Sequence, residues 1–294
     1  MSRRIRSADE LVYQLVINAF LFCVLLLMFV PVWKVLMMSL TPVDLPRDRS
    51  FGLLIAPWDW KFDAYAQFLG SPHFLRAAMN SFMILVSGVA TSLFLTIPMA
   101  YVLSVKALPG RMLLSTFVLI PFLFDPGLIP TYLVVTNTVG LSNKLSSVYL
   151  PAAISVYNVF VMKNFFEGLP LELREAARID GASELQILLR IVMPLSKPII
   201  LTIGLFYGVH FWNDFFTAMV YINDPKLLPL PVLLRNILNA ANFNEYVEMD
   251  AFSSASIYSL KAASVLLAAL PMVVIYPFIQ RYFTKGTLAG GIKG

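Results

Sequence analysis

The feature that most constrains this fold is a series of long apolar runs separated by shorter polar segments. A helix of about 20 apolar residues crosses the ~30 Å hydrocarbon core of a bilayer, and several runs reach that length. The composition agrees, because 59% of the 294 residues are hydrophobic and only 13% are charged, with a mean hydropathy of +0.76. These values exclude an ordinary soluble domain and predict an all-α, polytopic membrane protein.

Six of these runs are predicted to span the membrane and to form a single transmembrane domain over residues 1–294. The first run is too long for a signal peptide and lacks a small-residue cleavage site, so it is interpreted as a signal anchor. The third run contains several prolines and Gly127, and a helix broken in this way at membrane depth is tolerated only against protein or water. The six runs cover approximately residues 15–38, 77–105, 112–136, 145–166, 199–221 and 257–280.

The distribution of basic residues predicts the orientation of these spans. If the N-terminus is cytoplasmic, 13 of the 22 Lys and Arg residues lie in or next to the inner segments, and the smaller share lies outside. An excess of Lys and Arg marks the cytoplasmic side of a membrane protein. Both ends are therefore expected inside (N-in, C-in), together with the polar segment 167–198 and the tail 281–294.

The polar segment 167–198 is predicted to form two short helices with a bend between them. Pro170 suits the first turn of the first helix, because its fixed φ is already helical. Gly181 can adopt the left-handed conformation that ends a helix. Ser183, followed three residues later by Gln186, is a capping-box signature for the start of the second helix.

The second of these helices is predicted to be amphipathic, with apolar side chains at i, i+3, i+4 and i+7 on one face. One interpretation of this periodicity is a helix pair that lies on the bilayer surface, and the other is a pair that docks to a partner protein. Pro194 and Pro198 are expected to end the helix. The predicted apolar positions are Leu185, Leu188, Leu189 and Val192, and the polar positions left for contacts are Glu184, Gln186 and Arg190.

The residues of this segment also match a family pattern at fixed spacing. The matched positions are Glu175, Ala176, Ala177, Gly181, Ile191, Met193 and Pro194. They resemble the EAA loop, E-A-A-x3-G-x9-I-x-L-P, of the membrane subunits of ATP-driven, binding-protein-dependent importers. Met193 replaces the leucine of the pattern, an apolar exchange that conserves volume. In that family the loop docks into a cleft on the cytoplasmic ATPase subunit.

This resemblance implies partners and coupling residues. The implied partners are a related but different membrane subunit, a dimer of ATPase subunits that binds ATP and Mg²⁺, and an external solute-binding protein. The tail from Lys285 to Gly294 is expected to be a flexible peptide that reaches between the ATPase subunits, the alternative being an unstructured end. The implied coupling residues are Glu175, Ala176, Ala177, Asp180, Gly181, Ala182, Ser183, Ile191 and Pro194.

Other segments resemble the maltose-type carbohydrate permeases, and among these the second membrane subunit. They include Asn80 in NSFMIL, the WNDFF segment at 212–216 and the C-terminal GGIKG. The segments PGLIPTYL and PLPVLLRNIL are most similar to the branch that imports alginate and aldouronate-type oligosaccharides. The resemblance therefore implies a carbohydrate substrate, an oligosaccharide, and a place in the bacterial inner membrane.

Polar residues within the predicted spans are candidates for the wall of a translocation path. A charge in hydrocarbon costs about 3 kcal/mol on insertion scales, so Asp125 is expected to face a cavity or a partner. The alternative for each residue is an interhelical hydrogen bond or a place near the membrane interface. The candidates are Asp125, Asn158, His210, Asn213 and Asp214.

The sequence lacks the motifs of an enzyme. It contains no GxxxxGK[ST] phosphate loop, HExxH or G-x-S-x-G, so we expect no catalytic residue, metal or cofactor on this chain, and ATP hydrolysis by a partner. Two histidines and the lone Cys23 are too few for a metal cluster. The pI near 9.3 is not accompanied by the basic and aromatic surface that nucleic-acid binding requires.

Two other classes of transporter remain as alternatives. One is the same kind of importer for peptides or amino acids, which only the carbohydrate-branch segments disfavour. The other is a stand-alone secondary transporter, which should carry an inverted repeat with paired broken helices or a chain of ionisable residues through its spans. The sequence shows neither of these signs.

Overall fold

The computed structural model describes residues 8–42, 55–239 and 257–290 of the chain. These residues form helices and connecting segments without a β-strand, which confirms the predicted all-α class. The chain divides into two units, one made of residues 1–71 and 241–268 and the other of residues 72–240 and 269–294.

The first unit is built on α1 (Ala8–Ser39), followed by a short 3-10 turn η1 (Pro57–Asp59) and by α3 (Asp63–Gly70). Within α1, the segment Val12–Ser39 is long and apolar enough to cross a bilayer, and its most apolar window is not buried by the rest of the chain. Its last turn is anchored, because the Ser39 hydroxyl lies 2.6 Å from the Tyr65 hydroxyl. The exposed apolar surface of α1 is therefore available to lipid or to another subunit.

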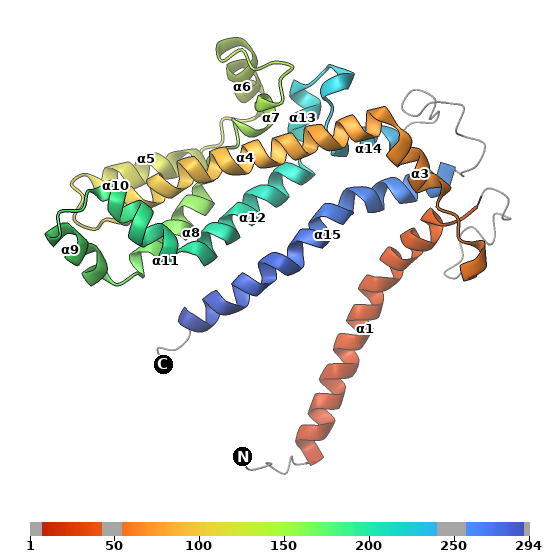
Figure 1. Cartoon of the computed structure of the whole chain (residues 1–294), viewed down its shortest axis with the longest axis horizontal. Helices are drawn as coiled ribbons and strands as arrows, with labels where there is room; N and C mark the ends of the chain where they lie inside the picture. Colours follow the sequence, from red (N-terminus) through yellow and green to blue (C-terminus); the bar gives the residue numbers. More distant parts are fainter. Residues whose placement is uncertain (1–7, 43–54, 240–256, 291–294) are drawn as a thin grey trace. The chain divides into compact units, whose positions relative to one another are not determined.

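The core of the second unit lies where three helices pack together: α4 (Pro72–Ser104), α8 (Val156–Glu167) and α12 (Lys197–Asn213). Figure 1 shows α4 running alongside α12, with α8 on the same side of α4. Buried apolar side chains from all three helices meet there. They include Ile84, Val159, Met162, Phe166, Ile203 and Tyr207.

Gly88 allows the close approach of α4 and α12. A β-carbon at this position would lie 2.6 Å from the Phe211 ring of α12 and 3.0 Å from the Tyr149 side chain. Small residues let neighbouring membrane helices approach to backbone contact distance. The distance between α4 and α12 therefore depends on the absence of a side chain at position 88.

The third predicted run forms a broken helix, as its prolines indicated. It consists of α5 (Arg111–Leu123), α6 (Leu128–Leu133) and a π-helical turn η2 (Val134–Thr138). The two halves of the run are bent by 109° at the break. Gly127 has φ +83°, a conformation that only glycine adopts easily, so this residue fixes the break at the start of α6.

The fourth and fifth predicted runs are each divided. Residues 145–166 form α7 (Ser146–Tyr149), a non-helical stretch with Pro151, and α8, whose N-terminus is capped by Ser155. Residues 199–221 form most of α12 and then α13 (Phe216–Tyr221), whose first turn is capped by Asp214 through the Thr217 N–H at 3.0 Å. Side-chain caps and proline interrupt these runs where hydrophobicity alone predicts one helix.

Beyond α13 the chain returns to the start of α4. The 3-10 turn η4 (Pro225–Leu227) and helix α14 (Leu230–Asn239) lie against α4. The Asn80 amide donates to the carbonyls of Lys226 at 2.9 Å and Leu228 at 3.1 Å. The Leu230 N–H donates to the Ser81 hydroxyl at 2.8 Å.

The last helix, α15, runs from Ile257 to Gly290 with two prolines inside it. The backbone of the predicted flexible tail is thus helical as far as Gly290, because the helix continues past the end of the apolar run. Residues 291–294 lie outside the described part of the chain.

The described residues contain three helices long and apolar enough to span a membrane, or up to five if each of two bent pairs is one span. The three are Val12–Ser39, Pro72–Ser104 and Tyr258–Pro277, and the bent pairs are the α5–η2 segment and the segment from Glu184 to Asn213. A multi-span helical protein is therefore established. The count of six spans and the N-in, C-in orientation stay predictions.

Candidate functional site

The first helix of segment 167–198 is α9 (Leu171–Ile179). Pro170, predicted in its first turn, is instead the N-cap residue directly before it. Its turns separate two faces. Arg174 and Ala177 are buried against the rest of the second unit, whereas Glu175 and Ala176 are exposed. The Glu175 carboxylate is therefore presented on the outer surface of a helix whose inner surface is anchored.

The bend after α9 follows the predicted chemistry. Gly181 has φ +81°, and the N–H of Ala182 donates to the Ala177 carbonyl at 2.9 Å, which closes the helix end. Asp180 and Gly181 are exposed at the tip of the bend. A β-carbon at Gly181 would meet nothing within 4 Å, so only the backbone conformation demands glycine here.

The second helix of the segment starts with the predicted capping box. The Ser183 hydroxyl accepts from the Gln186 N–H, and the Gln186 side chain accepts from the Ser183 N–H at 2.8 Å. The helix comprises α10 (Glu184–Ile187), a π-helical turn η3 (Leu188–Val192) and α11 (Met193–Leu195). The helix–bend–helix prediction is confirmed.

The predicted apolar face of this second helix is confirmed at Leu188 and Val192 and wrong at Leu185 and Leu189. Leu185 and Leu189 are 65% and 52% exposed, whereas Ile187 is fully buried. The buried residues still recur with the helical period, but they lie on a face of the helix that only partly overlaps the predicted one. The apolar residues of this helix cover more than one face, and the helices packed against it determine which face is buried. The inward positions are Ile187, Leu188, Val192 and, in part, Ile191.

The helix ends at Leu195, next to the predicted prolines. Pro194 occupies its last turn and is exposed, and Pro198 lies in the first turn of α12. The two helices meet at Ser196 with a bend of 84°. Neither proline supplies the N–H that would continue the helix through the break.

Arg174 anchors α9 to the rest of the unit. The side chain is buried, and its guanidinium donates to the Phe166 carbonyl at 2.5 Å and to the Ser104 hydroxyl at 3.3 Å. The guanidinium also lies over the Tyr101 ring, 5.5 Å from its centroid. Burial lowers the pKa of Arg174, but a guanidinium stays charged in proteins, so this is a buried cation held by a carbonyl and an aromatic face.

Glu184 joins the two short helices to α4. Its carboxylate accepts a hydrogen bond from the Tyr101 hydroxyl at 2.6 Å and another from Nε of Arg178 at 2.8 Å. The second bond raises the pKa of Arg178. One carboxylate therefore connects α9, α10 and the end of α4.

A second group of charges surrounds the base of the segment. The Glu167 carboxylate at the end of α8 is paired with Arg111 and, at 3.1 Å, with Lys163. Arg111 also donates through Nε to the Leu103 carbonyl at 2.7 Å. These contacts join the α4–α5 turn to α8, so segment 167–198 extends from a braced base.

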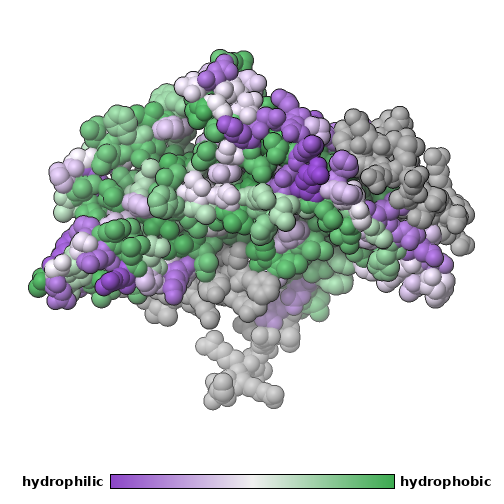
Figure 2. Space-filling view, turned by 45° about the horizontal axis from the view of Figure 1, so that its top comes forward, coloured by the Kyte–Doolittle hydropathy of each residue, from purple (hydrophilic) through white to green (hydrophobic). Residues whose placement is uncertain are grey.

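A cleft of about 190 Å³ lies between the α4–α5 turn and α9. Lys106 and Ala107 line one side, and Glu175 and Arg178 line the other. Figure 2 shows hydrophilic residues gathered at the left end of the molecule, where α9 lies in Figure 1, next to a largely hydrophobic surface. The family-motif glutamate is thus part of a charged, accessible surface.

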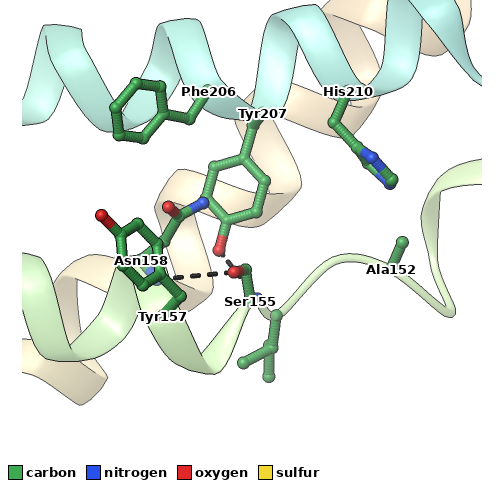
Figure 3. A pocket seen from close by; sticks show the side chains of 8 residues that line it. Ala152, Ser155, Tyr157, Asn158, Phe206, Tyr207 and His210 are labelled. Atoms are coloured by element: carbon green, nitrogen blue, oxygen red, sulfur yellow. Dashed lines mark hydrogen bonds between the residues drawn. The ribbon is translucent and has the colours of Figure 1, made fainter. Parts of the chain in front are cut away.

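A separate cavity of about 530 Å³ lies between α8, α12 and the stretch before α8. It contains two of the predicted path residues, Asn158 and His210. Figure 3 shows that Tyr207 points from α12 toward α8, where its hydroxyl accepts from the Ser155 N–H at 3.0 Å. The remaining lining residues are Ala152, Ile154, Tyr157 and Phe206.

The other three predicted path residues do not line this cavity. Asp125 is exposed in the break after α5, where its carboxylate accepts from the Gly127 N–H at 2.9 Å. The Asn213 amide donates to the Val209 carbonyl at 2.9 Å, and Asp214 caps α13. One Asp214 oxygen is buried without a hydrogen-bond partner among the described residues. Local turns and caps therefore employ these side chains.

Sequence reasoning missed several residues that shape both sites. Arg174 is one position before the family motif and shares the inward face with Ala177, a signal that helical periodicity contains. Tyr101, Tyr157 and Phe206 lie within apolar runs and carried no distinguishing signal. No group of three or more His, Cys, Asp or Glu side chains that would hold a metal ion occurs in the described ranges.

The fold defines the class of protein, a multi-span helical membrane protein with an exposed helix pair between α8 and α12. The family model described as "Binding-protein-dependent transport system inner membrane component" matches residues 13–288, and this chain belongs to that family. It is accordingly an inner-membrane protein and a permease-type subunit.

The chain is also similar to individual transport proteins. The chain is 43% identical to Protein LplC of Bacillus subtilis (strain 168), over 84% of this chain and 83% of that protein. It is 37% identical to the polygalacturonan/rhamnogalacturonan transport system permease protein YtcP of the same organism, over 98% of this chain and 99% of that one. A chain of the crystal structure of a bacterial ABC transporter involved in the import of the acidic polysaccharide alginate superimposes with a TM-score of 0.86 at 30% identity, covering 95% of this chain and 99% of that one.

Proposed function

We propose that this chain is the second permease subunit of an ATP-driven importer and forms half of the path for an oligosaccharide delivered by a solute-binding protein. Family membership over residues 13–288 is the observation that carries this proposal. The carbohydrate substrate is supported by two similar proteins. One is the 37% identical polygalacturonan/rhamnogalacturonan transport system permease, and the other is a 30% identical chain of a transporter that imports the polysaccharide alginate. Similarity to these two proteins favours a sugar importer over a peptide or amino-acid importer and over a stand-alone secondary transporter.

The proposed assembly contains four kinds of component. This chain pairs with a different permease subunit, a dimer of ATPase subunits binds ATP and Mg²⁺ on the cytoplasmic side, and a solute-binding protein delivers the sugar outside. The chain itself performs no catalysis and carries no cofactor. In this proposal it has six spans with both ends in the cytoplasm, supported by the Lys and Arg excess on that side.

The proposed coupling element is the pair of helices that runs from α9 to α11. Its exposed face carries Glu175, Ala176 and the bend at Asp180 and Gly181. Its inner face is fixed by Glu184 to α4 and by Arg174 to both α4 and α8. A rigidly anchored helix pair transmits the displacement of a docked ATPase to the spans. The residues proposed to take part are Glu175, Ala176, Ala177, Asp180, Gly181, Ala182, Ser183, Ile191 and Pro194.

The proposed path wall includes Asn158 and His210, whose side chains line the cavity between α8 and α12. Asp125, Asn213 and Asp214 remain candidates for the path wall because they are polar residues within predicted spans. If Asp125 faces the path, Asp125→Asn alters transport. A cysteine introduced there by Asp125→Cys then reacts with aqueous thiol reagents in at least one nucleotide state, and failure to react in every state favours a packing role.

The experiment that tests the coupling role uses the complete reconstituted transporter. Glu175→Ala and Gly181→Leu are expected to weaken ATPase association or to abolish substrate-stimulated ATP hydrolysis. Leucine at φ +81° costs about 1 kcal/mol in backbone strain. Glu172→Ala, which removes another exposed carboxylate of α9, is the matched control.

Crosslinking supplies the second measurement. The variant Ala182→Cys, in a background where Cys23 is replaced by serine, is expected to crosslink to the ATPase subunit. Normal coupled transport in both motif variants, with no crosslink to the ATPase, contradicts the docking role. Uptake of labelled oligopeptides rather than oligosaccharides by the wild-type complex contradicts the proposed substrate class.

A further inference from the structure

The cavity between α8 and α12 combines aromatic rings with polar groups that have no partner in the described part of the chain. Asn158 is only 5% exposed, and its side-chain amide makes no hydrogen bond to another described residue. Tyr157 and Phe206 expose their rings, at 59% and 39%. The volume of about 530 Å³ lies in the range of roughly 300–1,000 Å³ that small-molecule pockets occupy.

The wall behind this cavity is fixed rather than adaptable. The Tyr207 hydroxyl lies 2.8 Å from the Thr96 hydroxyl of α4 and accepts from the Ser155 N–H at 3.0 Å. Its ring is buried and stacked with Phe211, with 6.2 Å between the centroids. Because Tyr207 joins α4, α8 and α12, the side chains in front of it, shown in Figure 3, are held in place.

The chemistry of the cavity favours a sugar over a lipid acyl chain as its occupant. A lipid acyl chain would bury the Asn158 amide without a hydrogen bond, which costs about 1–3 kcal/mol on the scale of protein mutations. A sugar presents C–H groups on the faces of its ring, which pack on aromatic rings, and hydroxyl groups at its rim, which both donate to and accept from an amide or an imidazole.

We propose that this cavity is an oligosaccharide subsite on this subunit, in which Tyr157 and Phe206 stack against sugar rings and Asn158 and His210 bind their hydroxyl groups. The proposal rests on the proposed importer function and adds to it a place and a set of contacts. Among the described residues, those that line the cavity include no Asp, Glu, Lys or Arg. The subsite therefore recognises the hydroxyls and ring faces that neutral and acidic sugars share, and it admits both.

The first test measures oligosaccharide uptake per ATP hydrolysed in the reconstituted complex with its loaded solute-binding protein. Asn158→Ala and Phe206→Ala are each expected to lower this ratio about tenfold, the equivalent of about 1.4 kcal/mol of lost contact with the sugar. Asn164→Ala removes an exposed amide from the same helix, and Phe94→Ala removes an exposed ring from α4. These two controls are expected to leave the ratio unchanged.

The second test needs no loss of transport. In a Cys23→Ser background, the variant Tyr157→Cys is labelled with an aqueous maleimide in vanadate-trapped complexes, with and without a uronate or neutral oligosaccharide. Bound sugar is expected to slow labelling severalfold. A thiol that is already protected without sugar shows that lipid or the partner permease fills the cavity, and a rate unaffected by sugar shows that sugar does not enter it.

The two proposals fail separately. If the wild-type complex imports no oligosaccharide, the proposed function is wrong. If the wild-type complex imports oligosaccharide and the Asn158 and Phe206 variants do so with the same ratio as their controls, the importer stands and the subsite is wrong.

Discussion

The two ends of α4 each hold a polar segment that does not continue the helix, but they hold it by different chemistry. Near the start of α4, Asn80 and Ser81 bind backbone groups of the η4–α14 segment through neutral hydrogen bonds. Near its end, Tyr101 and Ser104 bind the charged side chains of Glu184 and Arg174. Backbone atoms are held at one end, and charged side chains at the other.

We expect the neutral attachment to be static and the charged attachment to adjust when a docked subunit moves the helix pair. Bonds from a buried amide to two carbonyls fix a loop in one geometry and do not respond to ionic strength. Bonds among charged side chains are stronger in direct contact but depend on screening and on the positions of long side chains. The charged end lies under the proposed coupling element, where a docked ATPase would pull on it.

The largest effect is expected from Arg174→Ala at the charged end. The substitution removes a buried guanidinium and leaves the Phe166 carbonyl with only the Leu169 N–H, at 3.4 Å, as a donor among the described residues. A hydrogen bond to a charged group contributes about 1.5–3 kcal/mol. The thermal midpoint of the purified complex should fall by more than in any other variant of this series. Arg190→Ala, at an exposed position of the same segment, is the control. Equal midpoints for the two variants contradict the anchoring role of Arg174.

A smaller effect is expected from Asn80→Ala at the neutral end. Two hydrogen bonds to carbonyls are lost, at a cost of roughly 2 kcal/mol in total. Amide hydrogen exchange should rise in residues 225–231 and stay unchanged in residues 171–190. Faster exchange in both regions would show that the two ends of α4 are not independent. Asn137→Ala removes an exposed amide and serves as the control.

Tyr101→Phe is expected to loosen the charged end by about 1 kcal/mol, because Glu184 is half exposed and solvent weakens the bond to it. The ring remains to pack against the Arg174 guanidinium, so α9 should stay in place while α10 exchanges faster. Hydrogen exchange in residues 183–190 measures this. Tyr276→Phe, at an exposed position of α15, controls for loss of a phenol. An unchanged exchange rate in residues 183–190 would mean that Glu184 is held by Arg178 alone.

The smallest effect is expected from salt. Raising the ionic strength from about 0.1 M to about 1 M shortens the Debye length from about 10 Å to about 3 Å. Exchange in residues 171–190 should increase slightly, and exchange in residues 225–231 should not change. A salt response of equal size at both ends removes the distinction between the charged and the neutral attachment.

Segment 167–198 shows how far the local sequence determines structure. The bend at Gly181 and the capping box at Ser183 were predicted from residue type and spacing, since both depend on atoms within four residues of each other. The inward face of the second helix was predicted correctly at Leu188 and Val192 but not at Leu185 and Leu189, which are exposed. Which leucines face inward depends on α4 and α8, which the local pattern does not contain.

The apolar runs show the same division. Hydrophobicity predicted where long apolar stretches lie, and the break in the third run followed from its prolines. The interruptions of the fourth and fifth runs depend on side-chain caps by Ser155 and Asp214, which compete with helix continuation. A hydropathy value averaged over a window of residues does not detect these caps.

By itself, the sequence determined the helical class, the membrane environment and the local geometry of segment 167–198, because each follows from composition or from short-range spacing. Only the tertiary structure decided that Arg174 is a buried anchor, that Glu184 reaches Tyr101 across 83 positions, and that Asn158 and His210 share a cavity while Asp125, Asn213 and Asp214 do not line it. The physical reason is that burial and partnership of a polar side chain depend on which distant helix packs against it. In this chain that helix is most often α4, whose close contact with α12 is set by the missing side chain at Gly88.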